Sequence, residues 1–561
     1  MRRLLSPCLA VWFLFWAAGT PVPGAWGEPP STPVAAPVPS ASPAPPEDPS
    51  ALLDRGLDQE RARNWSAAIE VYREALERWP SRVEFSRRLR LCEIHFKLHR
   101  RYADTSFRQV LLPIPLSQAT ELYDEVLERI QNNYVDSVTL EPLVRHGLDN
   151  LEVALRDPVF LQTNAPGAAP ERVTWLRDTL RQYRANLVIP DRAAAVRMAV
   201  ACCELARQAI GMAGSPVLLE FTCGACDALD DFTSYLTPDK LEDLYAMIDG
   251  NFVGLGIELK VDKAGLRLIG VIRGGPAWEA GLQPGDVIVE ISGRSIQGLA
   301  LDEAANRLQG AEGSTVDLVL RRRDGTSQSF RLVRRHVDVE SVTKVKVVDP
   351  AAGIGYLRLS GFQKTSTEEL DQAIAALSRQ NMTVLVIDLR GNPGGLLNVA
   401  VEIAERFLDA GLIVSTRGRA QGQTQMLAAN GRARWRMPLY ILVDHDSASA
   451  SEILAGALQD HRRATIVGAR TYGKGSVQSI FSLRSAPAGL KLTTAKFYSP
   501  LNRPYSEQGV QPDVPVQSRT AARPADETAL LREEANFGDP AKDPVLAAAI
   551  RTAMSRSRSS R

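Results

Sequence analysis

Two short segments of this chain carry side chains suited to nucleophilic catalysis. The first, DSASASE at 446–452, places Ser449 where a loop is expected to enter an apolar helix. A serine at such a junction has an exposed hydroxyl and helix amides nearby. The second, TYGKGSVQ at 471–478, holds Lys474 between glycines and beside apolar chain, where burial can keep its amine neutral. Together the segments offer the nucleophile and the base of a Ser/Lys hydrolase.

Each segment also has a simpler interpretation. Ser-Ala repeats are common in loops, and a Gly-Lys-Gly sequence usually marks a solvated turn. Gly468, Gly473 and Lys474 have the spacing of a phosphate-binding P-loop. That motif needs a Ser or Thr hydroxyl at the next position, where this chain has Gly475. The P-loop is therefore disfavoured.

The polar neighbours of Ser449 have other expected roles. His445 is a rival base, because histidine needs almost no tuning to accept a proton near neutral pH. It lies on the same short segment as the serine, however, whereas Ser/His/Asp triads usually bring the histidine from a distant part of the chain. Ser447 and Ser451 are expected to satisfy helix-end amides.

Length, charge and the N-terminus limit the class of protein. At 561 residues the chain should hold more than one domain, and its net charge of +1 gives no global field that would attract nucleic acid. Residues 1–27 begin with Arg2 and Arg3 and continue into an apolar run over 8–19, which is typical of a secretory signal. The run is shorter than the roughly 20 residues of a transmembrane helix. We expect export to the periplasm or cell envelope, with a membrane tether if the signal stays uncleaved.

Six cysteines are too few for a disulfide scaffold. Cys223 and Cys226 form a CxxC motif without the second pair that a zinc site needs, and their helical surroundings disfavour a redox motif. We expect two buried thiols or an incidental disulfide there, and core thiols at Cys202 and Cys203. The sequence predicts no metal ligand set and no cofactor.

The N-terminal half is expected to be helical. The Pro/Ala/Ser-rich segment 28–50 predicts a disordered linker. Within 51–110, Gly56 and Tyr72 occupy positions typical of a tetratricopeptide (TPR) repeat. A lone repeat cannot bury its face, so we expect it to pack on the helical region 111–248, with a protein partner as the alternative.

A β-rich region follows at 249–337 and resembles a PDZ domain. It contains FVGLGI and then GPA, AGL and PGDVI segments in order, separated by glycine turns. The backbone around Leu255, Gly256 and Ile257 matches the carboxylate-binding loop of such domains. Amides in a loop of this kind can receive the α-carboxylate of a peptide, which then adds as a strand to the sheet edge. A small β-barrel without a ligand is the alternative.

Residues 338–520 read as an α/β domain, and 521–561 as a C-terminal helical segment and tail. A buried strand over 384–389 runs into the loop RGNPGG, and another over 439–443 delivers the chain to Ser449. Loops that follow parallel strands meet at the carboxyl edge of a sheet, where ligands bind. We therefore expect the two loops to lie side by side.

In this order the motifs resemble the carboxy-terminal processing (tail-specific) protease family. The likeness covers roughly residues 115–550 and includes FVGLGI, DLRGNPGG, SASASE, GKGSVQ and GVQPD. It implies a multi-domain α+β chain with an N-terminal helical region, a PDZ domain and a crotonase-like α/β protease domain.

The resemblance also implies a set of site residues. Ser449 would be the nucleophile, Lys474 the general base and Gln478 the residue that orients it, with the amides of Ala450 and Gly395 as the oxyanion hole. Lowering the lysine pKa from about 10.4 toward neutrality costs roughly 4 kcal/mol, for which desolvation is the natural source. A carboxylate in place of Gln478 would raise that pKa and spoil the base.

The implied function is a serine endopeptidase that cleaves exported proteins near their C-termini. Its partners would be proteins or peptides with free C-termini, captured by the PDZ domain, and no nucleic acid. One alternative is an inactive PDZ/TPR adaptor of the cell envelope, against which the intact Ser449, Lys474 and Gln478 argue. Another is the acyl-CoA chemistry of crotonase folds, which the export signal and the PDZ motifs disfavour.

Overall fold

The computed structural model describes residues 48–262, 264–297, 307–310, 312–431, 433–516 and 536–559. Of these, 48–124 and 140–228 form one compact unit, and 125–139 with the residues from 229 onward form the other. The expected signal peptide at 1–27 and most of the linker at 28–50 lie outside the described residues. Within the described part of the chain, no helix is both long enough and apolar enough to cross a bilayer.

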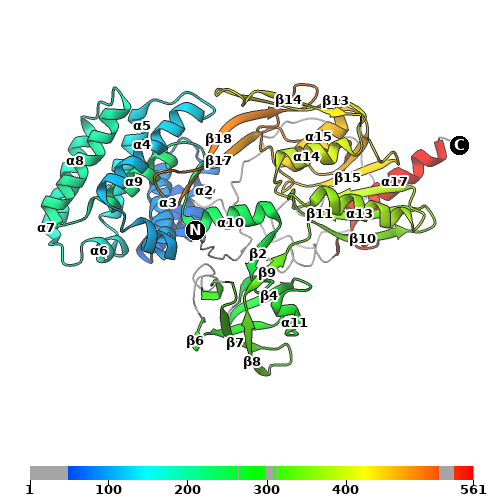
Figure 1. The fold of residues 1–561 in the computed structure, drawn as a ribbon, viewed down its shortest axis with the longest axis horizontal. Coiled ribbons are helices and arrows are strands. Elements are labelled where there is room, and N and C mark those ends of the chain that lie inside the picture. The colour runs from blue at the N-terminus through cyan, green and yellow to red at the C-terminus, as the bar shows by residue number, and fades with distance from the viewer. Residues whose placement is uncertain are drawn as a thin grey trace, which may run out of the picture. The chain divides into compact units, whose positions relative to one another are not determined.

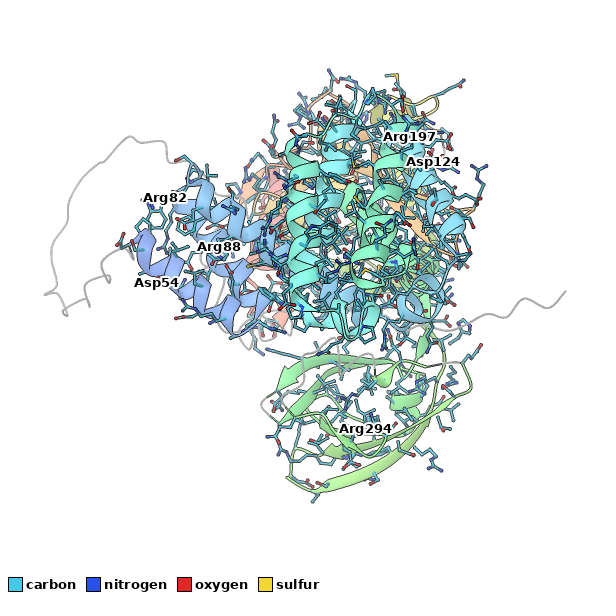
Figure 2. The ribbon with its side chains drawn as sticks, turned by 90° about the vertical axis from the view of Figure 1, so that its left-hand side faces the viewer. Asp54, Arg82, Arg88, Asp124, Arg197 and Arg294 are labelled. Carbon is cyan, nitrogen blue, oxygen red and sulfur yellow. The ribbon has the colours of Figure 1, made fainter. Side chains whose placement is uncertain are left out.

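The first unit is helical, as predicted, and starts with α1 (Pro49–Arg61), α2 (Trp65–Arg78) and α3 (Val83–Ala103) (Figure 1). Helix α1 thus begins just inside the segment assigned to the linker. Figure 2 labels Asp54 on α1, Arg82 just before α3 and Arg88 within α3. Tyr72 of α2 is fully buried against Gly56 of α1, where a Cβ atom would overlap the tyrosine ring. This contact explains why the two positions suit a glycine and a large aromatic residue.

The rest of this unit packs around α5 and α9. Its further elements are η1 (Phe107–Leu111), the first part of α4 (Leu116–Asn133), α5 (Leu140–Ala154), α6 (Pro158–Asn164), α7 (Pro170–Ala185), α8 (Arg192–Ile210) and α9 (Gly214–Asp227). Gly224 of α9 lies against Gly147 of α5, so closely that a Cβ atom on Gly224 would be 2.6 Å from the Gly147 Cα. Cys223 and Cys226 are free, buried thiols, and burial raises the pKa of Cys223 to about 12. Of the two expectations for this pair, buried thiols are found.

The β-rich region in the other unit has a core of its own. Helix α10 (Pro238–Asp249) leads into β2 (Asn251–Gly254), which pairs with β9 (Arg335–Asp338). Between them a sheet runs in the order β3-β4-β5-β7-β8, with β6 beside β5 and the short helix α11 (Pro276–Glu279). The strand bounds are Ile257–Asp262, Gly265–Val271, Val287–Ile291, Thr315–Arg321 and Ser327–Val333, and Arg294–Ser295 for β6.

The α/β region is built on a sheet in the order β10-β11-β12-β15-β16-β19 (Figure 1). The bounds are Val342–Asp349, Ile354–Leu359, Val384–Asp388, Leu439–Val443, Ala464–Gly468 and Val514–Pro515. The strands β11, β12, β15, β16 and β19 are parallel, and β10 is antiparallel. Because β12 and β15 are neighbours, the loops that follow them leave the same edge of the sheet. The predicted arrangement of these loops is confirmed.

Helices cover both faces of this sheet. One core includes residues of α13 (Ser366–Ser378), α14 (Leu397–Glu405) and α15 (Ala450–Asp460), and the opposite core includes residues of α17 (Pro544–Ser559). A second sheet, which the sequence did not predict, runs β1-β18-β13-β14 with β17 paired to β18. Its bounds are Ser234–Leu236, Gly489–Tyr498, Ala410–Gly418, Gln425–Asn430 and Ser476–Ser482. Strand β17 begins two residues after Lys474, so this sheet positions the lysine.

Candidate active site

Ser449 stands immediately before α15, in the loop that follows β15, as predicted. Its backbone has φ 57° and ψ −115°, a region that residues with a side chain rarely occupy. Strain of this kind costs about 1–3 kcal/mol and persists only where the surroundings hold it, which is common at functional sites. In the capping box at the start of α15, the Ser449 side chain accepts from the Glu452 backbone N–H, and among the described residues its O–H donates to no acceptor.

The loop after β12 holds the strained turn in place. Asn392 is fully buried; its side-chain oxygen accepts from the Gly394 N–H at 2.8 Å, and its carbonyl accepts from the Ala448 N–H at 3.0 Å. Gly394 lies so close to Ser449 that an added Cβ atom would be 2.8 Å from the Ser449 Cβ. The Ser451 hydroxyl donates to the same Asn392 carbonyl at 2.9 Å.

The serines flanking Ser449 join loops rather than cap helix amides. Ser451 donates to a carbonyl of the β12 loop, and the Ser447 hydroxyl donates to the Leu389 carbonyl at 2.9 Å while it accepts from the Asp444 N–H. The expected capping role is therefore wrong for both. Since α15 is packed directly against the β12 loop, buried hydroxyls there find carbonyls of that loop as partners.

Glu452 connects the two predicted catalytic segments. This fully buried carboxylate accepts from the Thr471 hydroxyl and the Gly473 N–H through Oε1, at 2.6 and 2.7 Å. Its Oε2 accepts from the backbone N–H groups of Ser449 and Lys474, at 2.8 and 2.9 Å. The backbone N–H groups of Ser449 and Lys474 are thus bound to the same oxygen atom. No role was predicted for Glu452, although the Ser-x-x-Glu spacing of a capping box is visible in the sequence.

The surroundings of Lys474 lower the pKa of its amine, as a general base requires. Its side chain is half-buried, with Nζ 4.8 Å from the centroid of the Phe232 ring. Burial and, to a smaller extent, the nearby Lys491 ammonium lower the pKa of Lys474 to about 8, against the opposing carboxylates of Glu452 and Asp230. A pKa near 8 leaves a useful fraction of neutral amine at physiological pH.

The Gln478 side chain donates to residues other than Lys474, which it was expected to orient. Its amide donates to the Ser476 hydroxyl at 2.9 Å and to the Thr493 hydroxyl at 3.4 Å. In the part of the chain that the structure describes, no hydrogen bond links Gln478 to Lys474, or Lys474 Nζ to the Ser449 hydroxyl. The backbones of serine and lysine are therefore brought together, while their side chains do not form a hydrogen bond.

The backbone N–H groups of Gly395 and Ala450, the two predicted oxyanion donors, differ from that of Gly394 in their hydrogen bonding. The Gly394 N–H is occupied by Asn392. For the N–H groups of Gly395 and Ala450, by contrast, the structure shows no acceptor among the residues it describes. Gly395 has φ 148°, and an added Cβ atom there would be 2.3 Å from the Phe362 carbonyl oxygen, so the position requires glycine.

A buried cluster of ion pairs lies at the end of β12 and contacts the loop that follows it. The Arg390 guanidinium donates to Asp388 at 2.9 Å and to Asp543 at 3.0 Å, and lies 4.0 Å from the centroid of the Phe537 ring. Burial alone would raise the pKa of Asp388, but Arg390 beside it lowers that pKa overall. Arg390 and Asp543 are 153 positions apart, so no local pattern in the sequence indicates the cluster.

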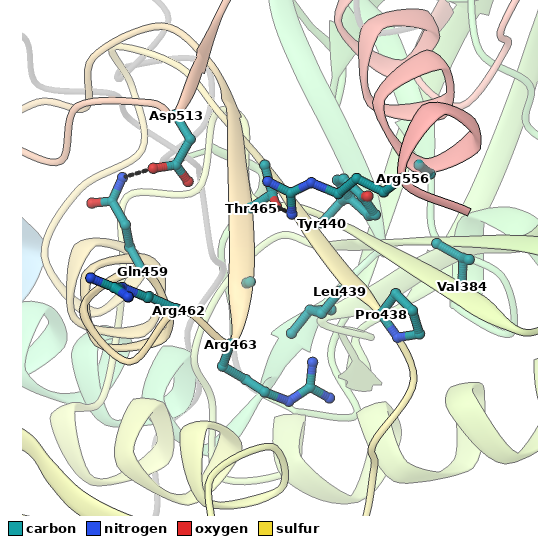
Figure 3. A pocket seen from close by; sticks show the side chains of 12 residues that line it. Val384, Pro438, Leu439, Tyr440, Gln459, Arg462, Arg463, Thr465, Asp513 and Arg556 are labelled. Carbon is teal, nitrogen blue, oxygen red and sulfur yellow. Dashed lines mark hydrogen bonds between the residues drawn. The ribbon is translucent and has the colours of Figure 1, made fainter. Parts of the chain in front are cut away.

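Two other features lie apart from this site. His445, the rival base, is half exposed in the loop, with Nε2 3.6 Å from the Asp446 carboxylate. A cavity of about 400 Å³ lies at the opposite edge of the sheet, where β12, β15 and β16 begin (Figure 3). There Gln459 is hydrogen-bonded to Asp513, and neither Ser449 nor Lys474 lines the cavity.

Comparison with known proteins gives matches in both parts of the second unit. Residues 353–516 match peptidase family S41, and residues 269–322 match the PDZ domain. The chain is 39% identical over 292 residues to a carboxyl-terminal-processing protease of Synechocystis, covering 51% of this chain and 68% of that protein. A carboxy-terminal-processing protease of Bartonella bacilliformis is 39% identical over 297 residues, covering 52% and 67%. A solved photosystem II D1 C-terminal processing protease is 28% identical, with a TM-score of 0.38 over 76% of this chain and 99% of that one.

Proposed function

Because the chain belongs to the carboxyl-terminal processing protease family, a family of serine proteases with a PDZ domain, we propose that it hydrolyses peptide bonds with Ser449 as nucleophile and Lys474 as base. The observation that carries this proposal is the Glu452 carboxylate, which accepts from the backbone N–H groups of both residues. A lysine pKa of about 8 adds to it.

The reaction proceeds through an acyl-enzyme. The Ser449 hydroxyl attacks the substrate carbonyl carbon while the neutral Lys474 amine takes its proton, and the resulting ammonium gives that proton to the leaving amine. A water molecule then attacks the acyl-enzyme in the same way and regenerates the free hydroxyl. For the first transfer, the Lys474 side chain rotates away from the Phe232 ring toward the serine, since proton transfer needs a hydrogen bond.

Ala450 and Gly395 would stabilise the oxyanion. Their N–H groups lack acceptors in the described structure, whereas the neighbouring Gly394 N–H is already paired with Asn392. Each donor preset for a developing negative charge contributes about 3–4 kcal/mol to the transition state. Gln478 would orient the Lys474 amine only after its amide leaves Ser476 and Thr493.

The PDZ domain would bind the free C-terminus of a protein substrate. Leu255 and Gly256 join β2 to β3, which begins at Ile257, and Gly256 has φ 72°, which turns the backbone sharply. The side chains of Leu255 and Ile257 are buried in the domain core, so the loop can offer its backbone amides to a carboxylate. Substrates would be exported proteins of the periplasm or cell envelope, an expectation that rests on the N-terminal segment.

Cleavage of a tagged peptide with a free C-terminus tests the proposal. Ser449→Ala and Lys474→Arg should each lower kcat/KM at least about 1,000-fold, because the first removes the nucleophile and the second installs a base that stays protonated. Lys364→Arg, at a position 64% exposed, serves as the matched control. Full activity in either site variant would refute the assignment.

The same peptide with an amidated C-terminus tests the PDZ proposal separately. Loss of the carboxylate should raise KM or lower kcat/KM at least about tenfold if amides at Gly256 and its neighbours bind it. Equal cleavage of the two peptides would show that the terminus is not recognised. An inactive adaptor would instead bind the carboxylate form and cleave neither peptide.

A further inference from the structure

Two histidines and an aspartate converge in the helical unit, far along the chain from the protease segments. His95 and His99 are one helical turn apart on α3, so their side chains lie on the same face. Asp157 precedes α6 and is almost fully buried. One potential ligand atom from each residue lies within 4.8 Å of the other two.

The geometry centres on a single carboxylate oxygen. Asp157 Oδ2 lies 2.8 Å from His95 Nδ1 and 2.8 Å from His99 Nε2. In a tetrahedral zinc site the ligand atoms are about 2.0–2.2 Å from the ion, which places them roughly 3.3 Å from each other. An outward shift of about half an ångström in each contact would therefore open this cluster to an ion.

The surroundings fix two of the three side chains. The His95 ring is stacked on the Trp65 indole, with centroids 4.2 Å apart and planes at 4°. Asp157 Oδ1 accepts from the Val159 N–H at 2.9 Å, which sets the direction of Oδ2. Outer contacts of this kind orient the ligands of metal sites. The His99 side chain is 32% exposed and gives the ion a path from solvent.

We propose that His95, His99 and Asp157 bind a divalent transition-metal ion, Zn²⁺ in the first instance, with water as the fourth ligand. Two imidazoles and one carboxylate suit Zn²⁺ and disfavour Ca²⁺ and Mg²⁺, which take oxygen ligands. The ion would clamp α3 to the turn before α6 and so stabilise the helical unit. This site does not depend on whether Ser449 and Lys474 are catalytic.

A hydrogen-bonded cluster without an ion is the competing explanation, since Asp157 already accepts from both rings. Titration of the full chain, first stripped with a chelator, with Zn²⁺ distinguishes the two by calorimetry. We expect one ion per chain with a Kd below roughly 1 µM. Co²⁺ in the same site should give the intense visible absorption of four-coordinate cobalt.

Asp157→Asn and His99→Gln are the informative variants. Asparagine caps a helix as well as aspartate does, so the first keeps the α6 N-cap while it removes the anionic ligand. Each variant should bind Zn²⁺ at least about 10–100-fold more weakly. His336→Gln, an exposed histidine of the β-rich region, is the matched control and should bind normally.

Thermal unfolding supplies a second readout. Zn²⁺ at a hundred times its Kd should raise the melting temperature of the helical unit by about 5–10 °C, and should leave that of Asp157→Asn unchanged. Absence of tight binding to the native chain would overturn the proposal. Binding that survives in both ligand variants, or that falls equally in the control, would also overturn it.

Discussion

Replacing Glu452 tests whether one carboxylate positions the backbones of Ser449 and Lys474, the two proposed catalytic residues. Its two oxygens accept from four donors, those of Thr471 and Gly473 on Oε1 and those of Ser449 and Lys474 on Oε2. In Glu452→Gln, the amide oxygen can keep the Oε2 position. The new NH2 group can then donate to the Thr471 hydroxyl, which is able to accept.

In that arrangement the Gly473 N–H and the Thr471 O–H both lose Oε1 as acceptor, although the Thr471 oxygen gains a donor. A buried donor left unsatisfied costs about 1–3 kcal/mol, so Glu452→Gln should lower the free energy of unfolding by at least that amount. Glu452→Ala leaves all four donors unpaired and should cost more than about 4 kcal/mol, with kcat reduced at least about 100-fold because serine and lysine lose their common anchor.

Glu452→Gln also removes a negative charge, which should change the pKa of Lys474. The Glu452 carboxylate raises the pKa of Lys474, so its removal should lower that pKa from about 8. The midpoint of the rise of kcat/KM with pH should then move to lower pH in Glu452→Gln.

Denaturant unfolding and pH–rate profiles measure both effects, with the exposed Glu368→Gln as the control, expected to change stability by less than about 0.5 kcal/mol. A Glu452→Ala variant as stable and as active as the native chain would refute the anchoring role. A midpoint that moves to higher pH in Glu452→Gln would refute the electrostatic reasoning.

Three further changes probe the same site. Lys491→Gln removes a positive charge that lowers the pKa of Lys474, so the midpoint of kcat/KM against pH should move above about 8, as a pH–rate profile would show. Gly394→Ala puts a Cβ atom 2.8 Å from that of Ser449 and requires a φ of 105°; steady-state kinetics should show kcat falling at least about 100-fold with KM little changed. Arg390→Met leaves two buried carboxylates without their cation and should destabilise the protein by about 3–5 kcal/mol in denaturant unfolding.

Features of the site set by local sequence were predictable. Apolar runs ending in glycine- and serine-rich loops predicted that β12 and β15 deliver their loops to one edge, and the sheet order agrees. The helix after Ser449 was predicted by its apolar spacing, and α15 begins at the next residue. These features depend on residues only a few positions apart.

The missed features depend on contacts between distant segments. Lys491 and Phe232, which surround Lys474, belong to a second sheet and to the loop before it, and no periodicity links them to the lysine. The expected contact of Gln478 is not present in this structure, because a register shift between Val477 and Gln478 accompanies pairing with Thr493, to which the side chain turns. A single sequence does not indicate which distant strands pair or where a β-bulge interrupts the pairing.

The central claim is that a neutral Lys474 removes the proton from Ser449. Stoichiometric acylation by a chromogenic ester, followed by mass spectrometry of the modified peptide across pH, measures this step directly. The label should appear on Ser449, its rate should rise with a midpoint near pH 8, and Lys474→Met should abolish the pH-dependent reaction. Acylation of another residue, or an unchanged rate in Lys474→Met, would contradict it.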